Sequence, residues 1–415
     1  MTVDLASIRA ARDRLASHIY RSPSPWSMSL SRLTGSTVHC KLEHLQMTGA
    51  FKERGARNKL LLLAPEARHR GVVAASAGNH ALGLAWHGRQ LGIPVCVVMP
   101  RFAPLMKIAN CRSFGAEVVL HGDDFAAARA EAQRIAAGNG RTFVPAFEDA
   151  DVISGQGTIG IELVEDVPNL DAVIVPVGGG GLLAGVGTAI KALRPSVQVI
   201  GVEPDHAACL SAALTAGRPV DVPVTPTLAD GLAVARMGDL TFQCCRQVVD
   251  RVVTVSEESI ARAILRLLEM EKAVVEGAGA TALAALMTGG LGLQGRTVAL
   301  VLSGGNIDLT TVGRIIERGL AADGRLARLT VHLDDRPGRL ACLLQVVAET
   351  GASIRDVDHD RSFAGSDPAS VGVTLVVETR DEDHIHTLHA TVTAAGFVAN
   401  PPMGHPPRPP TQSPG

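Results

Sequence analysis

The residue best suited to carry chemistry is Lys52, within the segment KLEHLQMTGAFKERGARN at positions 41–58. The chain holds six lysines against thirty-three arginines, so a lysine at this point suggests that an amine is needed and not merely a positive charge. A desolvated lysine can lose its proton and attack a carbonyl, whereas arginine stays protonated. A lone lysine is usually a solvated surface residue. The apolar-flanked turn around this one, which is expected to open a helix, favours a functional role.

Three glycine-rich turns follow along the chain, at Ser76–His80 (SAGNH), Gly178–Leu182 (GGGGL) and Ser303–Asn306 (SGGN). In the second turn, successive glycines allow backbone N–H groups to converge on a phosphate at the start of a helix. The sequence around it has neither a Walker lysine nor a suitably spaced ribose-binding acid, which disfavours a nucleotide site. The alternative for such a run of glycines is a bare hinge.

The four motifs, in this order, resemble those of the fold-type-II pyridoxal-phosphate enzymes, in particular the threonine and serine dehydratases, over roughly residues 5–320. The resemblance implies a two-part α/β fold with parallel sheets, similar to the β-subunit of tryptophan synthase. It also implies pyridoxal 5′-phosphate as the cofactor, with Lys52 bound covalently to its aldehyde and later removing the proton from the substrate Cα. Both roles require an amine with a low pKa, which burial would produce.

The same resemblance implies contacts for the other motif residues. Phe51 would pack on the cofactor ring, Asn79 would bond its phenolic oxygen, and Ser303 would bond its ring nitrogen. Gly231 would approach the cofactor, and its phosphate would be held by Gly178, Gly179, Gly180, Gly181 and Leu182. The substrate carboxylate would be held at a helix N-terminus by Ser76, Ala77, Gly78, Asn79 and His80. The plain alternatives are a core phenylalanine, a turn-capping serine and a structural histidine, and His80 is given no proton transfer.

Three positions refine the expected reaction. A neutral hydroxyl at Ser303, unlike a carboxylate, would not hold the ring nitrogen protonated, which disfavours transamination and suits β-elimination. Serine racemases of this fold carry a serine base where this chain has Ala77, so racemisation is disfavoured. Glu203 and Ala207 match a divalent-metal site of related enzymes, but Cys209 replaces its aspartate. We therefore expect no divalent metal there, with a monovalent cation as the open alternative.

Composition narrows the function classes further. Of 415 residues, 46% are hydrophobic and 19% are charged, as in compact proteins of two or three domains. The net charge of −2 and an aromatic content of 3% disfavour nucleic acid and anionic membranes as partners. Seven scattered cysteines without metal-ligand spacing, and an N-terminus without an apolar signal segment, predict a reduced cytoplasmic protein.

Short apolar runs alternate with helical segments over the first 320 residues, which predicts parallel sheets covered on both faces. Strands are expected at Gly71–Ala75, Pro94–Met99, Glu117–Leu120, Thr142–Pro145, Ala172–Val177, Val197–Val202 and Thr297–Leu302. Helices are expected at His80–Leu91 and Phe125–Ala137. We assign residues 1–322 to a catalytic domain. By the family resemblance, residues 58–146 form a smaller part set into it, with the active site in the cleft.

The pattern changes near residue 326. Leu329, Val331 and Leu333 alternate with polar residues as in a half-buried strand, and a helical face follows the turn Asp335–Gly338. With strands at Ala352–Asp358, Val371–Glu378 and Phe397-Val398, and a helix before the last, the order is the ferredoxin-like βαββαβ. The sequence RLTVHLDDRPGRLACLL resembles the ACT-type regulatory domains. We expect such a domain at 328–400, binding a small effector near that turn or at a paired-domain interface, and a disordered proline-rich tail at 401–415.

Taken together, the motifs and the family that they resemble imply an ammonia-lyase that converts L-threonine to 2-oxobutyrate and ammonia, and L-serine to pyruvate. A homodimer or homotetramer is expected. One rival is another reaction on the same scaffold, such as hydroxyaspartate dehydration, β-replacement, or serine-preferring dehydration or racemisation. The other is a metabolite-binding regulatory protein with an inactive catalytic domain, against which the retained Lys52, Asn79, glycine run and Ser303 argue.

Overall fold

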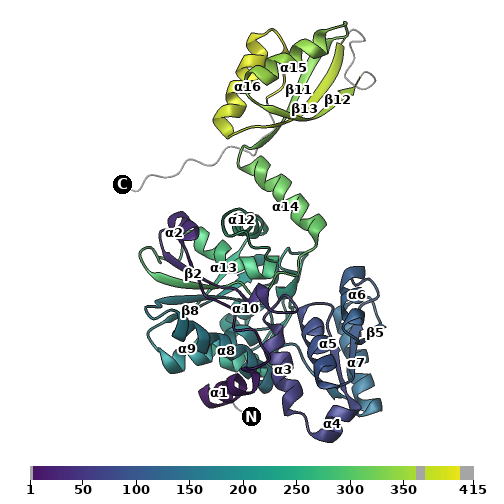
Figure 1. The fold of residues 1–415 in the computed structure, drawn as a ribbon, viewed down its shortest axis with the longest axis vertical. Helices are drawn as coiled ribbons and strands as arrows, with labels where there is room; N and C mark the ends of the chain where they lie inside the picture. Colours follow the sequence, from purple (N-terminus) through teal and green to yellow (C-terminus); the bar gives the residue numbers. More distant parts are fainter. Residues whose placement is uncertain (1–2, 361–369, 402–415) are drawn as a thin grey trace. The chain divides into compact units, whose positions relative to one another are not determined.

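The computed structural model describes residues 3–360 and 370–401, and the chain forms two compact units, Met1–Ile307 and Asp308–Gly415 (Figure 1). All seven cysteines are free thiols. In the described part of the chain, no helix combines the length and the apolar character that crossing a membrane requires.

A six-stranded sheet forms the larger part of the first unit. Its order is β1-β2-β10-β7-β8-β9, and all neighbours are parallel except β1 and β2. The strands are β1 (Trp26–Ser27), β2 (Thr37–Lys41), β7 (Ala172–Pro176), β8 (Gln198–Pro204), β9 (Arg251–Val255) and β10 (Thr297–Val301). The sequence predicted β7, β8 and β10, but it missed the other three. Of these, β1 and β9 are the sheet edges and β2 includes His39 and Lys41, so none of them reads as a continuous apolar run.

The first unit contains further helices besides those of the second sheet described below. They are α1 (Leu5–Leu15), α2 (Met28–Thr34), α3 (Lys52–Leu62), α4 (Pro65–Arg70), α8 (Ala150–Asp166), α9 (Gly181–Leu193), α10 (Cys209–Ala216), α11 (Asp239–Val248), α12 (Glu257–Arg266) and α13 (Gly277–Met287). Short helical turns lie at η1 (Glu43–Leu45), η2 (Asp205–Ala207), η3 (Asp230–Leu232) and η4 (Leu267–Glu271). The helix expected to open at Lys52 and the one expected near Leu182 are therefore confirmed as α3 and α9.

A second, four-stranded parallel sheet has the order β5-β4-β3-β6. Its strands are β3 (Val72–Ala75), β4 (Val95–Met99), β5 (Glu117–Leu120) and β6 (Thr142–Phe143), and its helices are α5 (Asn79–Leu91), α6 (Leu105–Ser113) and α7 (Phe125–Asn139). The four strands and the helices α5 and α7 were predicted, although β6 ends before Pro145. The sheet falls within residues 58–146, and the finer boundaries of that part stay a prediction.

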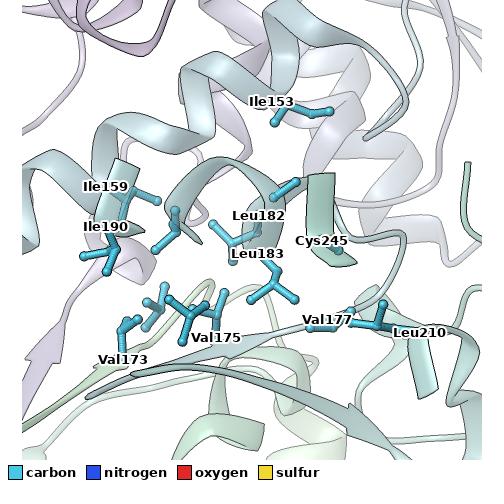
Figure 2. Packing of buried hydrophobic residues seen from close by; sticks show 14 of the residues in the cluster. Ile153, Ile159, Val173, Val175, Val177, Leu182, Leu183, Ile190, Leu210 and Cys245 are labelled. Atoms are coloured by element: carbon cyan, nitrogen blue, oxygen red, sulfur yellow. The ribbon is translucent and has the colours of Figure 1, made fainter. Parts of the chain in front are cut away.

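The core of the larger part lies between β7 and the helices α8 and α9 (Figure 2). Val173, Val175 and Val177 present side chains to Leu183 and Ile190, all of which are almost completely buried. Each such side chain removed from water stabilises the fold by about 1.5–3 kcal/mol. This packing explains why β7 reads as an unbroken apolar run.

Glycines bring α3, α8 and α9 unusually close together. A Cβ on Gly155 of α8 would lie 2.6 Å from the Cα of Gly55 in α3. A Cβ on Gly185 of α9 would overlap the carbonyl oxygen of Ile153 in α8. The helix that begins at Lys52 is thus packed backbone to backbone, which limits the movement of its first turn.

The second unit contains one four-stranded antiparallel sheet of order β12-β13-β11-β14. Its elements are α14 (Leu309–Ala322), β11 (Leu326–Asp334), α15 (Arg339–Glu349), β12 (Ser353–Asp360), β13 (Ser370–Glu378), α16 (Glu382–Ala394) and β14 (Val398–Ala399). From β11 onward the order is the predicted βαββαβ. Leu329, Val331 and Val373 pack with Leu343 and Val392 of the helices in a separate core. The boundaries 1–322 and 328–400 stay predictions, and the expected tail lies outside the described residues apart from Pro401.

Candidate active site

Lys52 is the first residue of α3, and its side chain is half-buried. Its Nζ donates to the carbonyl oxygen of Ala146 at 2.9 Å and lies 5.2 Å from the centroid of the Phe51 ring. Burial lowers the pKa of the amine from 10.5 to about 8, although the charge of Glu276 opposes the shift. The neutral form of this amine is therefore a minority below pH 8 but is far more abundant near physiological pH than in an ordinary lysine, as a nucleophile or a base requires.

The turn that carries Lys52 is held against the end of β10. The N–H of Phe51 donates to the carbonyl of Ser303 at 3.0 Å, and Ala50 forms an isolated β-bridge with Gly304. Ser303 itself is buried just beyond the strand, where ligands bind in open α/β sheets. The structure thus brings Phe51, Lys52 and Ser303 together from opposite ends of the unit.

The glycine run Gly178–Gly181 joins β7 to α9, and Gly180 has a left-handed backbone with a φ of +88°. Two carbonyls of the run accept from buried thiols, Cys209 Sγ to Gly178 and Cys245 Sγ to Gly180, both at 3.3 Å. Among the described residues, the backbone N–H groups of 178–182 meet no protein acceptor. Free N–H groups at the positive end of a helix form an anion site.

Close contacts leave no room for side chains in this run. A Cβ on Gly179 would overlap the ring of Phe147, and a Cβ on Gly178 would lie 2.9 Å from the Cα of Leu232. Leu232 follows Gly231 in η3, and a Cβ on Gly231 would lie 4.0 Å from Glu276 Oε1. Gly231 is therefore placed between the glycine run and the acid.

The segment Ser76–His80 lies at the end of β3 and leads into α5, which begins at Asn79. Within the described part of the chain, the N–H groups of Ala77, Asn79 and His80 have no protein acceptor, and a Cβ on Gly78 would meet open space. These free donors at a helix N-terminus suit a carboxylate. The side chain at position 77 is a methyl group and offers no base.

The ring of His80 is buried, and its Nε2 donates to the carbonyl of Val144 at 3.0 Å. Burial and then the charge of Lys52 lower the pKa of this imidazole to about 3. A histidine that is neutral throughout the physiological range, and bonded to the backbone just after β6, has the environment expected of a structural residue. The expectation that His80 moves no proton stays a prediction with this support.

Sequence reasoning missed Glu276, which precedes α13 and is buried. Its Oε1 accepts from Asn79 Nδ2 at 2.7 Å, and Asn306 Nδ2 donates to Asn79 Oδ1 at 2.8 Å. Burial, followed by the charge of Asp230, raises the pKa of Glu276 to about 7. The available signal was that Glu276 is the one charged residue in the otherwise apolar stretch 273–287.

The residues considered for a metal site have local roles. Both carboxylate oxygens of Glu203 are bonded at the start of α10, by the N–H groups of Leu210 at 2.6 Å and Ser211 at 2.9 Å. Ala207 lies in η2, and the thiol of Cys209 is turned toward Gly178. A cation at this position would have to displace Glu203 from its helix, and the absence of a divalent ion stays a prediction.

Comparison with known proteins agrees with this geometry. The family model described as "Pyridoxal-phosphate dependent enzyme" matches residues 15–304. An L-threonine ammonia-lyase of Thermotoga maritima is 46% identical over 395 residues, covering 95% of this chain and 98% of the relative. The processed form of threonine deaminase isoform 2 from Solanum lycopersicum matches with a TM-score of 0.71 and 34% identity, over 76% of this chain and 94% of its own. Maize serine racemase matches with a TM-score of 0.73 and 35% identity, over 77% of this chain and 98% of the racemase chain.

Proposed function

The chain belongs to the family of pyridoxal-phosphate dependent enzymes, and from this premise we propose that it is an L-threonine ammonia-lyase. It converts L-threonine to 2-oxobutyrate and ammonia by β-elimination. The observation that carries the proposal is the half-buried amine of Lys52, with a pKa of about 8, beside Phe51, Ser303 and Glu276. An amine in this state suits both covalent attachment to an aldehyde and removal of a Cα proton.

The residues present fit the cofactor. The unpaired N–H groups of 178–182 at the start of α9 would hold its phosphate. Lys52 would hold its aldehyde carbon, Phe51 its ring face, and Asn79 and Ser303 the polar atoms of the ring. When bound, pyridoxal phosphate supplies an electron-withdrawing ring conjugated with the substrate nitrogen, which makes the Cα proton acidic.

Groups of the protein itself would bind the substrate and move its protons. The N–H groups of Ala77, Asn79 and His80 bind the substrate carboxylate and so present Cα to the amine. With the cofactor bound, the substrate amine would take the place of Lys52 on the aldehyde carbon, and the freed Nζ would accept the Cα proton, where the Ala146 carbonyl stabilises the ammonium that forms. The electron pair left at Cα would form a double bond to Cβ as the β-hydroxyl leaves. By the family resemblance, the phosphate of the bound cofactor would supply the proton with which the hydroxyl leaves as water. The released enamine takes up water and loses ammonia to give 2-oxobutyrate.

The test is release of a 2-oxo acid from L-threonine by purified protein with added pyridoxal phosphate. Removal of a general base lowers turnover by about 10²–10⁴-fold, so we expect Lys52→Ala to lose at least that much. Lys59→Ala is the matched control, because Lys59 lies on the same helix but pairs with Asp149 at 2.6 Å and Asp151 at 3.0 Å. A parent protein that binds the cofactor yet leaves L-threonine unchanged would overturn the proposal.

Substrate preference needs a separate comparison. L-serine has the same β-hydroxyl and lacks only the methyl group, so we propose that it is converted to pyruvate more weakly. A single methylene is worth about 1–3 kcal/mol of discrimination. A panel of L-serine, hydroxyaspartate and β-substituted alanines separates this proposal from the rival lyases. A chiral assay with L-serine separates it from racemisation, against which the side chain of Ala77 argues.

We also propose that the second unit binds a small effector. Gly338, with a left-handed φ of +87°, forms the turn that precedes α15, and residues 334–338 are exposed. The alignment with the Thermotoga maritima lyase is long enough to include most of this unit. Branched-chain amino acids and nucleotides should change the KM for threonine several-fold in the full chain and not in a chain ending near Ala322. Identical responses of the two chains would remove the proposal.

The assembly and the compartment are further proposals. We propose a homodimer or homotetramer, because Trp26, Met28 and Met47 expose large apolar side chains in the first unit. The mass in solution, measured by light scattering, tests this, and a monomer would contradict it. We propose a cytoplasmic location because seven free thiols suit a reducing compartment. Fractionation of cells that produce the protein tests this.

A further inference from the structure

A chain of side-chain amides and one carboxylate runs through the site. Asn306 Nδ2 donates to the carbonyl of Thr48 at 2.7 Å and to Asn79 Oδ1 at 2.8 Å. Asn79 Nδ2 in turn donates to Glu276 Oε1 at 2.7 Å. Both hydrogens of Asn306 Nδ2 and one hydrogen of Asn79 Nδ2 meet acceptors in this series, which runs from the backbone at one end to the buried acid at the other.

This arrangement fixes which end of the Asn79 amide faces each neighbour. The carbonyl of Thr48 can only accept, so it must face the nitrogen of Asn306, and that nitrogen must face the oxygen of Asn79. Ionised Glu276 can also only accept, so it must face the nitrogen of Asn79. Rotating the Asn79 amide by 180° would set nitrogen against nitrogen at Asn306 and oxygen against oxygen at Glu276.

The backbone around Glu276 leaves room for this carboxylate. Its own N–H donates to the carbonyl of Gly304 at 3.0 Å, and a Cβ on Gly304 would overlap Oε1. Gly304 belongs to the motif Ser303–Asn306, which also supplies the amide of Asn306. The motif that would contact the cofactor ring through Ser303 therefore also contacts Glu276 through Gly304. Glu276 is only 5% exposed.

We propose that Glu276 is a positioning residue, which acts through Asn79 by holding the amide so that its second Nδ2 hydrogen is offered to the phenolic oxygen of the cofactor. The proposal rests on the proposed function, in which Asn79 makes that contact. Glu276 need not touch the substrate. Its effect is to exclude the rotated amide, which would offer an oxygen where a donor is needed.

The protonation state of Glu276 should set how firmly the amide is held. Around its carboxyl lie Asp230 of η3, whose charge raises its pKa, and Lys107 of α6, whose charge lowers it, with Asn79 and Asn306 as the polar contacts. Lys52 of α3 is also within electrostatic reach of it. When the pH is above the Glu276 pKa of about 7, the carboxylate can only accept hydrogen bonds, and so it excludes the rotated amide. Below that pH the protonated acid can donate too, so the restraint weakens.

The experiment measures the bound cofactor itself. Absorbance spectra of the loaded protein between pH 6 and 9, and the dissociation constant of pyridoxal phosphate, are compared for the parent, Glu276→Gln, Asn79→Ala and the double variant. Glutamine keeps the shape but can donate, so we expect a shifted spectrum, loss of the pH dependence near neutrality and roughly tenfold weaker cofactor binding. The double variant should be no worse than Asn79→Ala alone, because both changes act on one contact.

Glu203→Gln is the matched control, since Glu203 is also a buried carboxyl with a raised pKa but bonds α10 instead of Asn79. Its spectra should follow those of the parent. Parental spectra in Glu276→Gln, or losses that add in the double variant, would overturn the proposal. If Glu276→Gln does not fold, the proposal is tested by the pH series of the parent protein. A dissociation constant of pyridoxal phosphate that does not change with pH would then count against the proposal. Turnover of threonine is measured separately. The absorbance spectra and the cofactor dissociation constant therefore still test the role of Glu276 if the protein does not catalyse the lyase reaction.

Discussion

The guanidinium of Arg54 and the carboxylate of Glu43 form two hydrogen bonds in the interior of the first unit, Nε to Oε2 at 2.9 Å and Nη2 to Oε1 at 2.7 Å. The same guanidinium donates to both oxygens of Glu162, at 2.7 and 2.9 Å. Lys41, fully buried, adds a contact of 2.6 Å to Glu162. Because Arg54 belongs to the first turn of α3, this network anchors the helix that presents Lys52 to η1, α8 and β2.

Replacing Arg54 by methionine should leave Glu43 and Glu162 buried with part of their partners missing. Breaking one side of a buried ion pair destabilises by about 3–5 kcal/mol, so we expect that loss in the free energy of unfolding measured with urea. The control is Arg12→Ala, which removes a half-exposed pair with Glu165 and should lose less than about 1 kcal/mol. Equal losses in the two variants would show that the buried network adds no stability.

The pKa of Lys52 predicts how cofactor loading depends on pH. Because burial lowers this pKa from 10.5 to about 8, the neutral amine is scarce below pH 8 and predominates above it. The rate of incorporation into cofactor-free protein, followed by absorbance, should rise about tenfold between pH 7 and pH 9 and then level off. A rate that continues to climb toward pH 10.5 would mean that the amine is not desolvated.

The left-handed Gly180 predicts a loss of cofactor binding in Gly180→Ala. At a φ of +88°, a side chain costs about 1–2 kcal/mol, and its Cβ would lie 2.5 Å from Met237 Cε. The N–H groups of the run should move, so the dissociation constant of pyridoxal phosphate should rise at least tenfold.

Gly217→Ala is the control that distinguishes the effect of backbone strain from the effect of steric overlap at the glycine run. Gly217 has a similar φ of +69°, but a Cβ there meets open space. This control should lower the unfolding free energy while leaving cofactor affinity at the parental value. If both variants lost affinity alike, general destabilisation rather than the shape of the glycine run would be responsible.

Removing either of two paired charges near Glu276 should shift its pKa, and the two shifts should be in opposite directions. Asp230 and Lys107 form an ion pair of 2.6 Å, and the first raises the pKa of Glu276 while the second lowers it. Asp230→Asn should therefore move the pH midpoint of cofactor affinity downward, and Lys107→Gln should move it upward. Midpoints that shift in the same direction would assign the pH dependence to another group. Lys191→Gln, with a partner in Asp250, serves as the charge control.

The sequence predicted the local elements well because their signals are local. The buried strands of both parallel sheets appear as apolar runs, and β11, β13 and α15 appear as the alternation and helical spacing of their apolar residues. The start of α3 at Lys52 was also predicted. The strands β1, β2 and β9 were missed because edge positions and polar residues interrupt the same signal.

The sequence predicted the motifs of the candidate site but not the contacts between their side chains. The segment 41–58 that contains Lys52 also contains Lys41, Glu43 and Arg54. Their order in the sequence does not reveal that their side chains are buried in one network. Asn306 was seen only as the end of a glycine-rich turn. Glu276 was overlooked because one acid in an apolar stretch has no partner until the chain has folded.

By itself, the sequence determined the type of fold, and it predicted Lys52 as the reactive amine and two glycine-rich turns as the sites for a phosphate and a carboxylate. Periodicity indicates the strands and helices, and the four ordered motifs carry the family resemblance that implies the type of fold and the roles of these residues. Each of these signals depends on neighbours along the chain. Only the tertiary structure decided that Glu276 meets Asn79 and that the pKa values of Glu276 and Lys52 move toward neutrality. Burial and electrostatic interaction depend on distances in space, and these join segments that lie far apart in the sequence.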